Sequence, residues 1–323
     1  MKTFLKRYWF ALFALIALAS TASARGPVAD SDFATRVLAF NAANGVPNYT
    51  ENPEFALGPP SADALPAVPD NTSLFSFGWT GYITLGFDRP IMNDTRNPGG
   101  FDFIVFGNTM YAGDDIDYPN FEPGFVEVGV DPAGNHEYGD GTQVLWYWLK
   151  GQPAPDTTDG FPMPMPAPGS ILLGYADCTP VDGAGDPLVP DDPSVPGITN
   201  GTAGGDPFDI AWAVDQNGAP VELPYIDFVR ISCAVNLNQG VLGYVSTEVD
   251  AVSIVRPRVP GDLDYDGFAT LADVVLTARF VNGSMDLTDE EKARANVSGH
   301  EGDPTMADAV GILRIASGLA SWK

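Results

Sequence analysis

The stretch DLDYDGFATLAD, residues 262–273, decides how the C-terminal part of this 323-residue chain folds. Its acidic side chains stand at positions 1, 3, 5 and 12 of the stretch: Asp262, Asp264, Asp266 and Asp273. Alternating carboxylates turn their oxygens to the inside of a tight loop, and Gly267 at position 6 permits the sharp bend. A hard cation such as Ca²⁺ takes about six to eight oxygen ligands. The stretch therefore predicts a calcium-binding loop.

The spacing is that of an EF-hand loop, in which groups at positions 7 and 9 complete the coordination. Phe268 and Thr270 stand at these two positions and join the predicted ligand set. The loop departs from the common pattern at Asp273, since most such loops end on a longer, bidentate glutamate. The alternative is an acidic, solvated turn, which the five matched positions make the weaker interpretation.

The residues after the loop recur 35 positions later in the chain. The repeated residues are Ala272, Asp273, Val275, Arg279 and Gly283, which return as Ala307, Asp308, Val310, Arg314 and Gly318. In each copy the apolar residues fall on one face of a helix, and a glycine stands where the helix must end. Between the copies, residues 288–291 read Thr-Asp-Glu-Glu, a capping box that predicts a short middle helix.

Two loop–helix units joined by a short helix resemble a dockerin module, and the resemblance covers residues 261–318. It implies a small helical domain that folds around calcium and binds a cohesin-type partner. The second copy departs from the pattern. Asn296, Ser298 and His300 stand where the first ligands belong, the spacing to Asp308 is one residue too long, and Glu301 replaces the glycine. We therefore expect one good calcium site and one weak or empty site.

The N-terminal segment has the pattern of a secretory signal peptide. Basic residues at positions 2, 6 and 7 precede an apolar stretch over residues 8–19, and the small residues 22–24 predict cleavage after Ala24. The apolar stretch is too short to span a bilayer comfortably, so an exported protein without a membrane-inserted segment is expected. The chain carries 42 acidic and 16 basic side chains, and this surface disfavours nucleic acid and anionic lipid as partners.

Residues 25–255 predict one mainly β domain, an antiparallel β-sandwich of jelly-roll type, which a Pro-rich linker over residues 256–260 joins to the calcium module of residues 261–323. Short β runs alternate here with Gly, Pro, Asn and Asp. The clearest strands are residues 81–87, 101–106, 124–130, 145–149, 226–233 and 249–255. Residues 101–106 are apolar on both faces, which predicts a central, buried strand.

Several segments of this domain resemble a family of exported bacterial cell-surface β-proteins. They are residues 81–91, 102–108, 122–126, 208–215 and 246–250. The resemblance implies an exported β-sandwich and supplies no catalytic residue.

The β domain contains a second candidate metal site and a candidate disulfide. Acidic side chains are closely spaced in the sequence at Asp114, Asp115, Asp117 and Glu122. Glu248 and Asp250 are further candidate ligands of the same site. A solvated acidic loop is an equal alternative. Cys178 and Cys233 are expected to form a disulfide in an oxidising compartment.

Aromatic residues offer a candidate ligand surface. Trp146 and Trp148 fall on one face of a predicted strand, with Tyr147 on the other. Burial in the core is the favoured interpretation of the pair, because large aromatic side chains are mostly buried; exposed, they would stack on sugar rings. Trp79, Tyr111 and Tyr118 are further candidates.

These patterns predict a non-catalytic β-sandwich that binds a glycan or surface component and attaches to a cohesin-type partner through a calcium-dependent module. The alternative is a dockerin-bearing hydrolase or lyase of polysaccharide breakdown, and a purely structural surface protein is a third interpretation. His136 is the one histidine of the β domain, and the sequence has no G-x-S-x-G turn. A Ser-His-Asp catalytic arrangement is therefore poorly supported.

Overall fold

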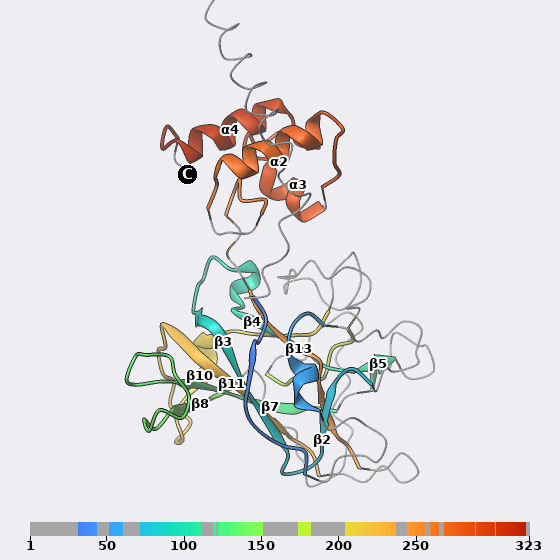
Figure 1. The fold of residues 1–323 in the computed structure, drawn as a ribbon, viewed down its shortest axis with the longest axis vertical. Helices are drawn as coiled ribbons and strands as arrows, with labels where there is room; N and C mark the ends of the chain where they lie inside the picture. Colours follow the sequence, from blue (N-terminus) through green and yellow to red (C-terminus); the bar gives the residue numbers. More distant parts are fainter. Residues whose placement is uncertain are drawn as a thin grey trace, which may run out of the picture. The chain divides into compact units, whose positions relative to one another are not determined.

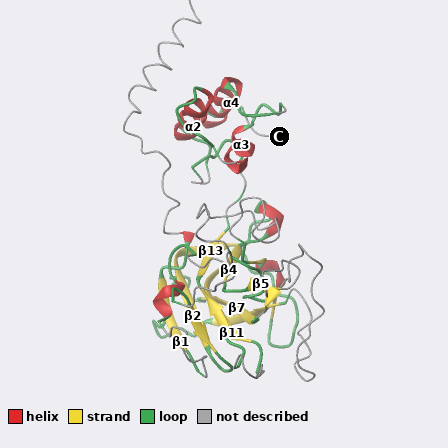
Figure 2. Ribbon diagram, turned by 90° about the vertical axis from the view of Figure 1, so that its right-hand side faces the viewer, coloured by secondary structure: helices red, strands yellow, loops and turns green. Residues whose placement is uncertain are grey.

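The computed structural model describes residues 32–43, 52–60, 72–111, 119–120, 122–150, 174–181, 204–236, 244–255, 257, 259–264, 268–287, 289–300 and 302–320. The chain divides into two units, one of them Ala29–Arg256 and the other containing Pro257–Lys323. The division falls within the predicted linker. Regular structure is mostly strand in the first unit, and it is helical in the second (Figure 2).

A six-stranded antiparallel sheet forms the largest element of the first unit (Figure 1). Its order is β1 (Arg36–Asn41), β3 (Tyr82–Met92), β11 (Tyr225–Cys233), β7 (Gly124–Val130), β8 (Leu145–Leu149) and β10 (Ala213–Val214). Val229 of β11 lies between Leu85 of β3 and Val128 of β7. Since side chains alternate along a strand, these three residues face the core while Arg230 faces outward.

Three smaller antiparallel sheets complete the β structure of the described residues. They pair β13 (Ala251–Ile254), β4 (Phe103–Phe106) and β9 (Asp206–Phe208); β12 (Thr247–Val249) and β2 (Phe75–Phe77); and β5 (Met110–Tyr111) and β6 (Pro119–Asn120). Strand β4 is central and all four of its residues are buried, as its apolar pattern predicts.

One core joins the six-stranded sheet to the smaller sheets. Its members include Ile83, Val126 and Val229 from the large sheet, and Phe103, Val105 and Val252 from β4 and β13. The rings of Phe103 and Phe208 stack with centroids 5.1 Å apart. Each such buried side chain contributes about 1.5–3 kcal/mol. The prediction of a mainly β first unit with antiparallel sheets is confirmed.

Two predictions about this unit are wrong: that Trp146 and Trp148 are buried in the core, and that Cys178 and Cys233 form a disulfide. Trp146 and Trp148 lie on the outer face of β8, while Tyr147 and Leu149 pack against the core. The predicted disulfide is absent, because Cys178 and Cys233 are buried free thiols that pack in different apolar clusters. Burial raises the pKa of both thiols.

The second unit contains the helices α2 (Leu271–Val281), α3 (Asp289–Ala295) and α4 (Met306–Ala316). Helices α2 and α4 begin with matching capping boxes, formed by Thr270 with Asp273 and by Thr305 with Asp308. Their core includes Leu263, Val274, Leu287, Ala295, Ala309 and Ile312. None of the described helices is long and apolar enough to cross a membrane.

Candidate metal sites

The first loop of the helical unit brings three predicted ligands together. Asp262, Asp264 and Asp273 each offer a carboxylate oxygen, and these oxygens all lie within 4.8 Å of one another. Asp262 and Asp273 are buried, and Asp264 is half-buried. Carboxylate oxygens at this spacing suit a hard cation such as Ca²⁺ or Mg²⁺. Asp266, the fourth predicted carboxylate, lies outside the described residues.

Asp273 closes this loop onto helix α2. Its Oδ1 accepts hydrogen bonds from the main-chain N–H groups of Leu263 (2.6 Å) and Asp264 (3.2 Å). Its Oδ2 accepts from the N–H (2.7 Å) and the hydroxyl (3.0 Å) of Thr270. Burial raises the pKa of Asp273 against the effect of these hydrogen bonds. Asp273 therefore combines two tasks, because it caps α2 and fixes the first and last parts of the loop to each other.

The structure also describes Thr270 and Phe268, two further members of the predicted ligand set. The Thr270 hydroxyl accepts a hydrogen bond from the Ala272 N–H (3.1 Å) besides donating to Asp273, so this side chain serves as the helix cap. The side chain of Phe268 is 70% exposed, and its predicted role concerns the main-chain carbonyl alone.

Helix α3 supplies a positive charge to the beginning of the loop. The Arg294 guanidinium lies 3.7 Å from Asp262 Oδ2, and both side chains are buried. The main-chain carbonyl of Arg294 accepts from the Gly261 N–H (2.7 Å), which fixes α3 to the residue before the first ligand. The guanidinium offsets part of the negative charge that the loop concentrates.

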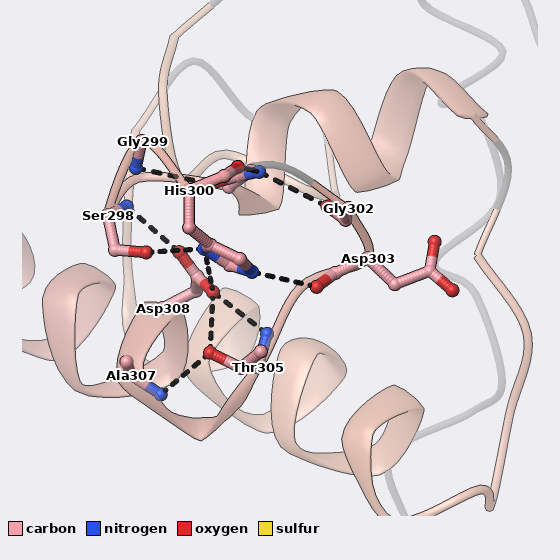
Figure 3. Close-up of polar contacts among 9 residues, drawn as sticks. Ser298, Gly299, His300, Gly302, Asp303, Thr305, Ala307 and Asp308 are labelled. Carbon is pink, nitrogen blue, oxygen red and sulfur yellow. Dashed lines mark hydrogen bonds and ion pairs between the residues drawn. The ribbon is translucent and has the colours of Figure 1, made fainter.

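In the second loop, Asp308 accepts main-chain hydrogen bonds like those of Asp273, and side chains of the loop itself lie around its carboxylate. Asp308 Oδ1 accepts from the Ser298 N–H (2.8 Å), and its Oδ2 accepts from the Thr305 N–H (2.8 Å). The His300 ring lies beside this carboxylate (Figure 3), with Nδ1 3.6 Å from Asp308 Oδ2. Nδ1 is also 2.8 Å from the Ser298 hydroxyl, and Nε2 is 3.0 Å from the Asp303 carbonyl.

The Asn296 side chain forms hydrogen bonds within the second loop. The Asn296 side-chain amide donates to the His300 carbonyl (2.6 Å), and its oxygen accepts from the Gly299 N–H. Although burial acts to raise the pKa of Asp308, hydrogen bonds from Thr305 and Ser298 hold it below its ordinary value. Among the described residues, this loop offers no group of three acidic, histidine or cysteine ligands like that of the first loop.

A second cluster of carboxylates lies inside the β unit. Glu122, Asp177 and Glu248 each offer an oxygen within 4.8 Å of the others. Glu122 precedes β7, Glu248 belongs to β12, and Asp177 is held by the bridge between Ala176 and Gly124. Of the predicted second metal site, Glu122 belongs to this cluster, whereas Asp114, Asp115 and Asp117 lie outside the described residues.

Hydrogen bonds from several elements orient the cluster. Asp177 Oδ1 accepts from the Asn108 N–H (2.8 Å) and the Thr109 hydroxyl (3.1 Å), and its Oδ2 accepts from the Glu248 N–H (2.9 Å). Glu248 Oε1 accepts from the hydroxyls of two serines, Ser76 (2.8 Å) and Ser246 (2.7 Å). No local sequence pattern indicates Asp177, because its partner Glu248 is 71 residues away.

Burial and mutual repulsion raise the pKa values of this cluster. Burial is the main cause for Glu122, whose pKa rises to about 7, and for Asp177, whose pKa rises to about 6. Burial and the charges of Glu122 and Asp177 raise the pKa of Glu248 well above its ordinary value. Asp206 lies close enough for the Asp177 charge to act on it, and burial raises its pKa to about 8.

The candidate ligand surface is an aromatic strip on the outer face of the large sheet. Trp148 is 36% exposed and packs edge-on against Phe125. The Arg230 guanidinium lies 3.7 Å from the centre of the Trp146 ring. Gly129 lies opposite Trp146, and a Cβ there would come within 2.9 Å of that ring. Trp79 is 39% exposed in the turn before β3; Tyr118 and the side chain of Tyr111 lie outside the described part.

His136 has a partner that its sequence context does not indicate. Its Nδ1 lies 2.6 Å from Oδ1 of the buried Asp227, whose Oδ2 accepts from the Asp131 N–H (2.7 Å). Asp131 in turn accepts from the N–H groups of Asn135 and His136. The pair thus anchors the turn after β7 to β11, which explains its geometry without catalysis.

Comparison of the chain with protein-family models and with curated proteins found no match.

Proposed function

We propose that this is an exported two-part protein in which a calcium-dependent, dockerin-like module attaches a ligand-binding β-sandwich of jelly-roll type to a cohesin-type partner. The N-terminal signal-peptide pattern supports export. The carboxylate spacing of the first loop supports calcium as its ion. Bound there, the ion would neutralise the loop carboxylates, while Asp273 and Thr270 connect the loop to the start of α2.

The observation that carries this proposal is a repeat preserved on the surface. Residues that recur between the copies include Ala272, Val275 and Arg279 on α2, and Ala307, Val310 and Arg314 on α4. All three α4 residues are exposed; on α2, Ala272 is exposed and the other two are half-buried. Core packing explains a repeat at buried positions, whereas it leaves these outer positions unconstrained.

Apolar residues extend both of these surfaces. Leu271 is 49% exposed at the start of α2, and Met306 is 38% exposed at the matching position of α4. Val310 is 48% exposed one turn later. Exposed apolar side chains beside an arginine are the composition typical of a protein interface, so each helix offers a docking face to a partner.

The β unit is proposed to bind a glycan through the strip formed by Trp148, Trp146 and Arg230. Sugar rings stack on exposed indole rings such as that of Trp148, and the Arg230 guanidinium, which lies over the Trp146 ring, donates hydrogen bonds to hydroxyl groups. The outward orientation of both tryptophans supports this assignment, because core packing does not account for it.

The docking part is tested by measuring binding of the full chain to a panel of cohesin modules, in calcium and in chelator. We expect calcium-dependent binding to at least one module, and a loss of at least about tenfold in Val310→Asp, because a charge enters an apolar contact. Asp286→Asn, an exposed change in the same unit, is the matched control. Binding that persists in chelator contradicts the proposal. Binding that neither Val310→Asp nor Val275→Asp weakens contradicts it as well.

The glycan part is tested on a glycan array with the full chain. We expect a defined sugar to bind and Trp148→Ala to abolish most of that signal, whereas Phe40→Ala, which truncates an exposed aromatic on β1, retains it. An array without any bound sugar would remove the ligand-binding role and leave a structural surface protein.

A further inference from the structure

The carboxylate cluster of the β unit lies mostly buried, and no positive charge among the described residues balances it. Asp177 and Glu248 are 0% and 1% exposed. Within the described part of the chain, no lysine, arginine or histidine forms an ion pair with Glu122, Asp177 or Glu248. Charged carboxylates in such a place are costly unless a cation or protons accompany them.

A second observation is a buried carboxylate oxygen that lacks a hydrogen-bond donor. Oε2 of Glu248 is buried and has no hydrogen-bond partner, although Oε1 of the same carboxylate accepts from two serine hydroxyls. Oδ1 of the neighbouring Asp206 is buried and unpartnered as well. Buried polar atoms are nearly always satisfied in native proteins, so each of these oxygens calls for a donor or an ion.

We propose that Glu122, Asp177 and Glu248 bind a divalent cation, Ca²⁺, inside the β unit. Each contributes a carboxylate oxygen, and the spread of at most 4.8 Å matches two oxygens on opposite sides of one calcium ion with bonds of about 2.4 Å. Oxygen donors alone favour a hard cation over zinc or copper. The free Oε2 of Glu248 becomes a ligand, while the serine hydroxyls keep Oε1 in place.

The ion would fasten segments that are far apart in the chain. Asp177 is hydrogen-bonded to Asn108, just beyond β4, and to Glu248 of β12, and Glu248 is hydrogen-bonded to Ser76 of β2. The Glu122 N–H donates to the Asp177 carbonyl (3.2 Å) beside the start of β7. A cation at this junction therefore cross-links the large sheet to the smaller sheets, independently of the calcium loop in the helical unit.

The test measures calcium bound by the full chain at equilibrium in an Asp264→Asn background, which disables the loop of the helical unit. We expect calcium to remain bound in this background and one ion per chain to be lost on adding Glu248→Gln. Glu222→Gln, an exposed glutamate in the same unit, should keep the ion. Equal calcium binding with and without Glu248→Gln overturns the proposal, as does the absence of calcium from the Asp264→Asn chain.

Hydrogen exchange of the Asp264→Asn chain provides a readout that needs no variant in the cluster. Calcium at a hundred times its dissociation constant should slow exchange in residues 122–126, 176–178 and 247–249 by up to about a hundredfold. Unchanged exchange in all three segments would show that shared protons, and not a cation, balance these carboxylates.

Discussion

In both units, single buried carboxylates connect separate segments of the chain through hydrogen bonds. Asp102 is an example, since its carboxylate is fully buried and accepts hydrogen bonds from the Asp94 N–H (2.9 Å), the Asn97 amide (2.9 Å) and the Ile210 N–H (2.8 Å). It connects the turn before β4 to the short helix after β9. Burial, as the largest effect, raises its pKa to about 6.

The raised pKa of Asp102 predicts a pH dependence. Because the folded state prefers the protonated acid, its stabilising effect is complete below about pH 4 and is lost as pH rises through about 6. Between pH 4 and pH 7 this group should lower the free energy of unfolding by on the order of 3 kcal/mol. Denaturant unfolding of the wild type and of Asp102→Asn over this range measures the difference. Parallel pH profiles for the two proteins would contradict the assignment.

Arg294 acts on the first loop of the helical unit through Asp262. Arg294→Met leaves a buried carboxylate without its cationic neighbour, so without calcium the helical unit should lose about 3 kcal/mol. With calcium the loss should be at least about 1 kcal/mol smaller, because the ion takes over the compensation. Hydrogen exchange in α2 and α4 measures both values, with the exposed Arg314→Met as the matched control. The same loss under both conditions would show that Arg294 does not act on the metal site.

At the scale of elements, the two capping boxes allow a matched experiment. Thr270→Ala and Thr305→Ala each remove a helix cap, so each should destabilise its helix by about 1 kcal/mol. Only Thr270 also supports a loop with three acidic ligands, so only Thr270→Ala should weaken calcium binding as well. Calcium titration and hydrogen exchange separate the two effects. Equal weakening of calcium binding by both variants would mean that the second loop also holds an ion.

Strand β8 presents different residues to the core and to solvent. Tyr147 packs against the core, so Tyr147→Ala should cost about 3 kcal/mol. Trp148→Ala should cost about 1 kcal/mol, because this ring is on the outer face and mainly contacts Phe125. Thermal or denaturant unfolding of the two variants compares them directly. The reverse order would place the tryptophan, and not the tyrosine, in the core.

At the scale of the whole molecule, sequence reasoning succeeded where structure is determined locally. Apolar spacing predicts the helices, and glycine predicts the turns that end them. Gly283 and Gly318 do adopt positive φ angles, of 74° and 66°. Strand β4 follows from its apolar pattern on both faces, and β7 and β8 follow from β-forming residues between flanking turn residues. The last predicted strand is divided at Asp250 into β12 and β13, which pair with different partners.

Long-range contacts account for what the sequence could not provide. Strand order depends on partners far along the chain, so the neighbours of β11 have no local signature. The outward position of Trp146 depends on Gly129 and Arg230, on two other strands. The disulfide prediction failed because compartment and cysteine number do not show whether two sulfurs meet. The Glu122–Asp177–Glu248 cluster is assembled by folding alone.

The central claim, that calcium bound at Asp262, Asp264 and Asp273 organises the helical unit, is tested most directly by hydrogen exchange of the full chain in calcium and in chelator. We predict that calcium slows exchange across α2 (Leu271–Val281), and that Asp264→Asn abolishes this protection whereas the exposed Asp286→Asn retains it. Exchange in α2 that calcium leaves unchanged, or protection that survives Asp264→Asn, would contradict the account.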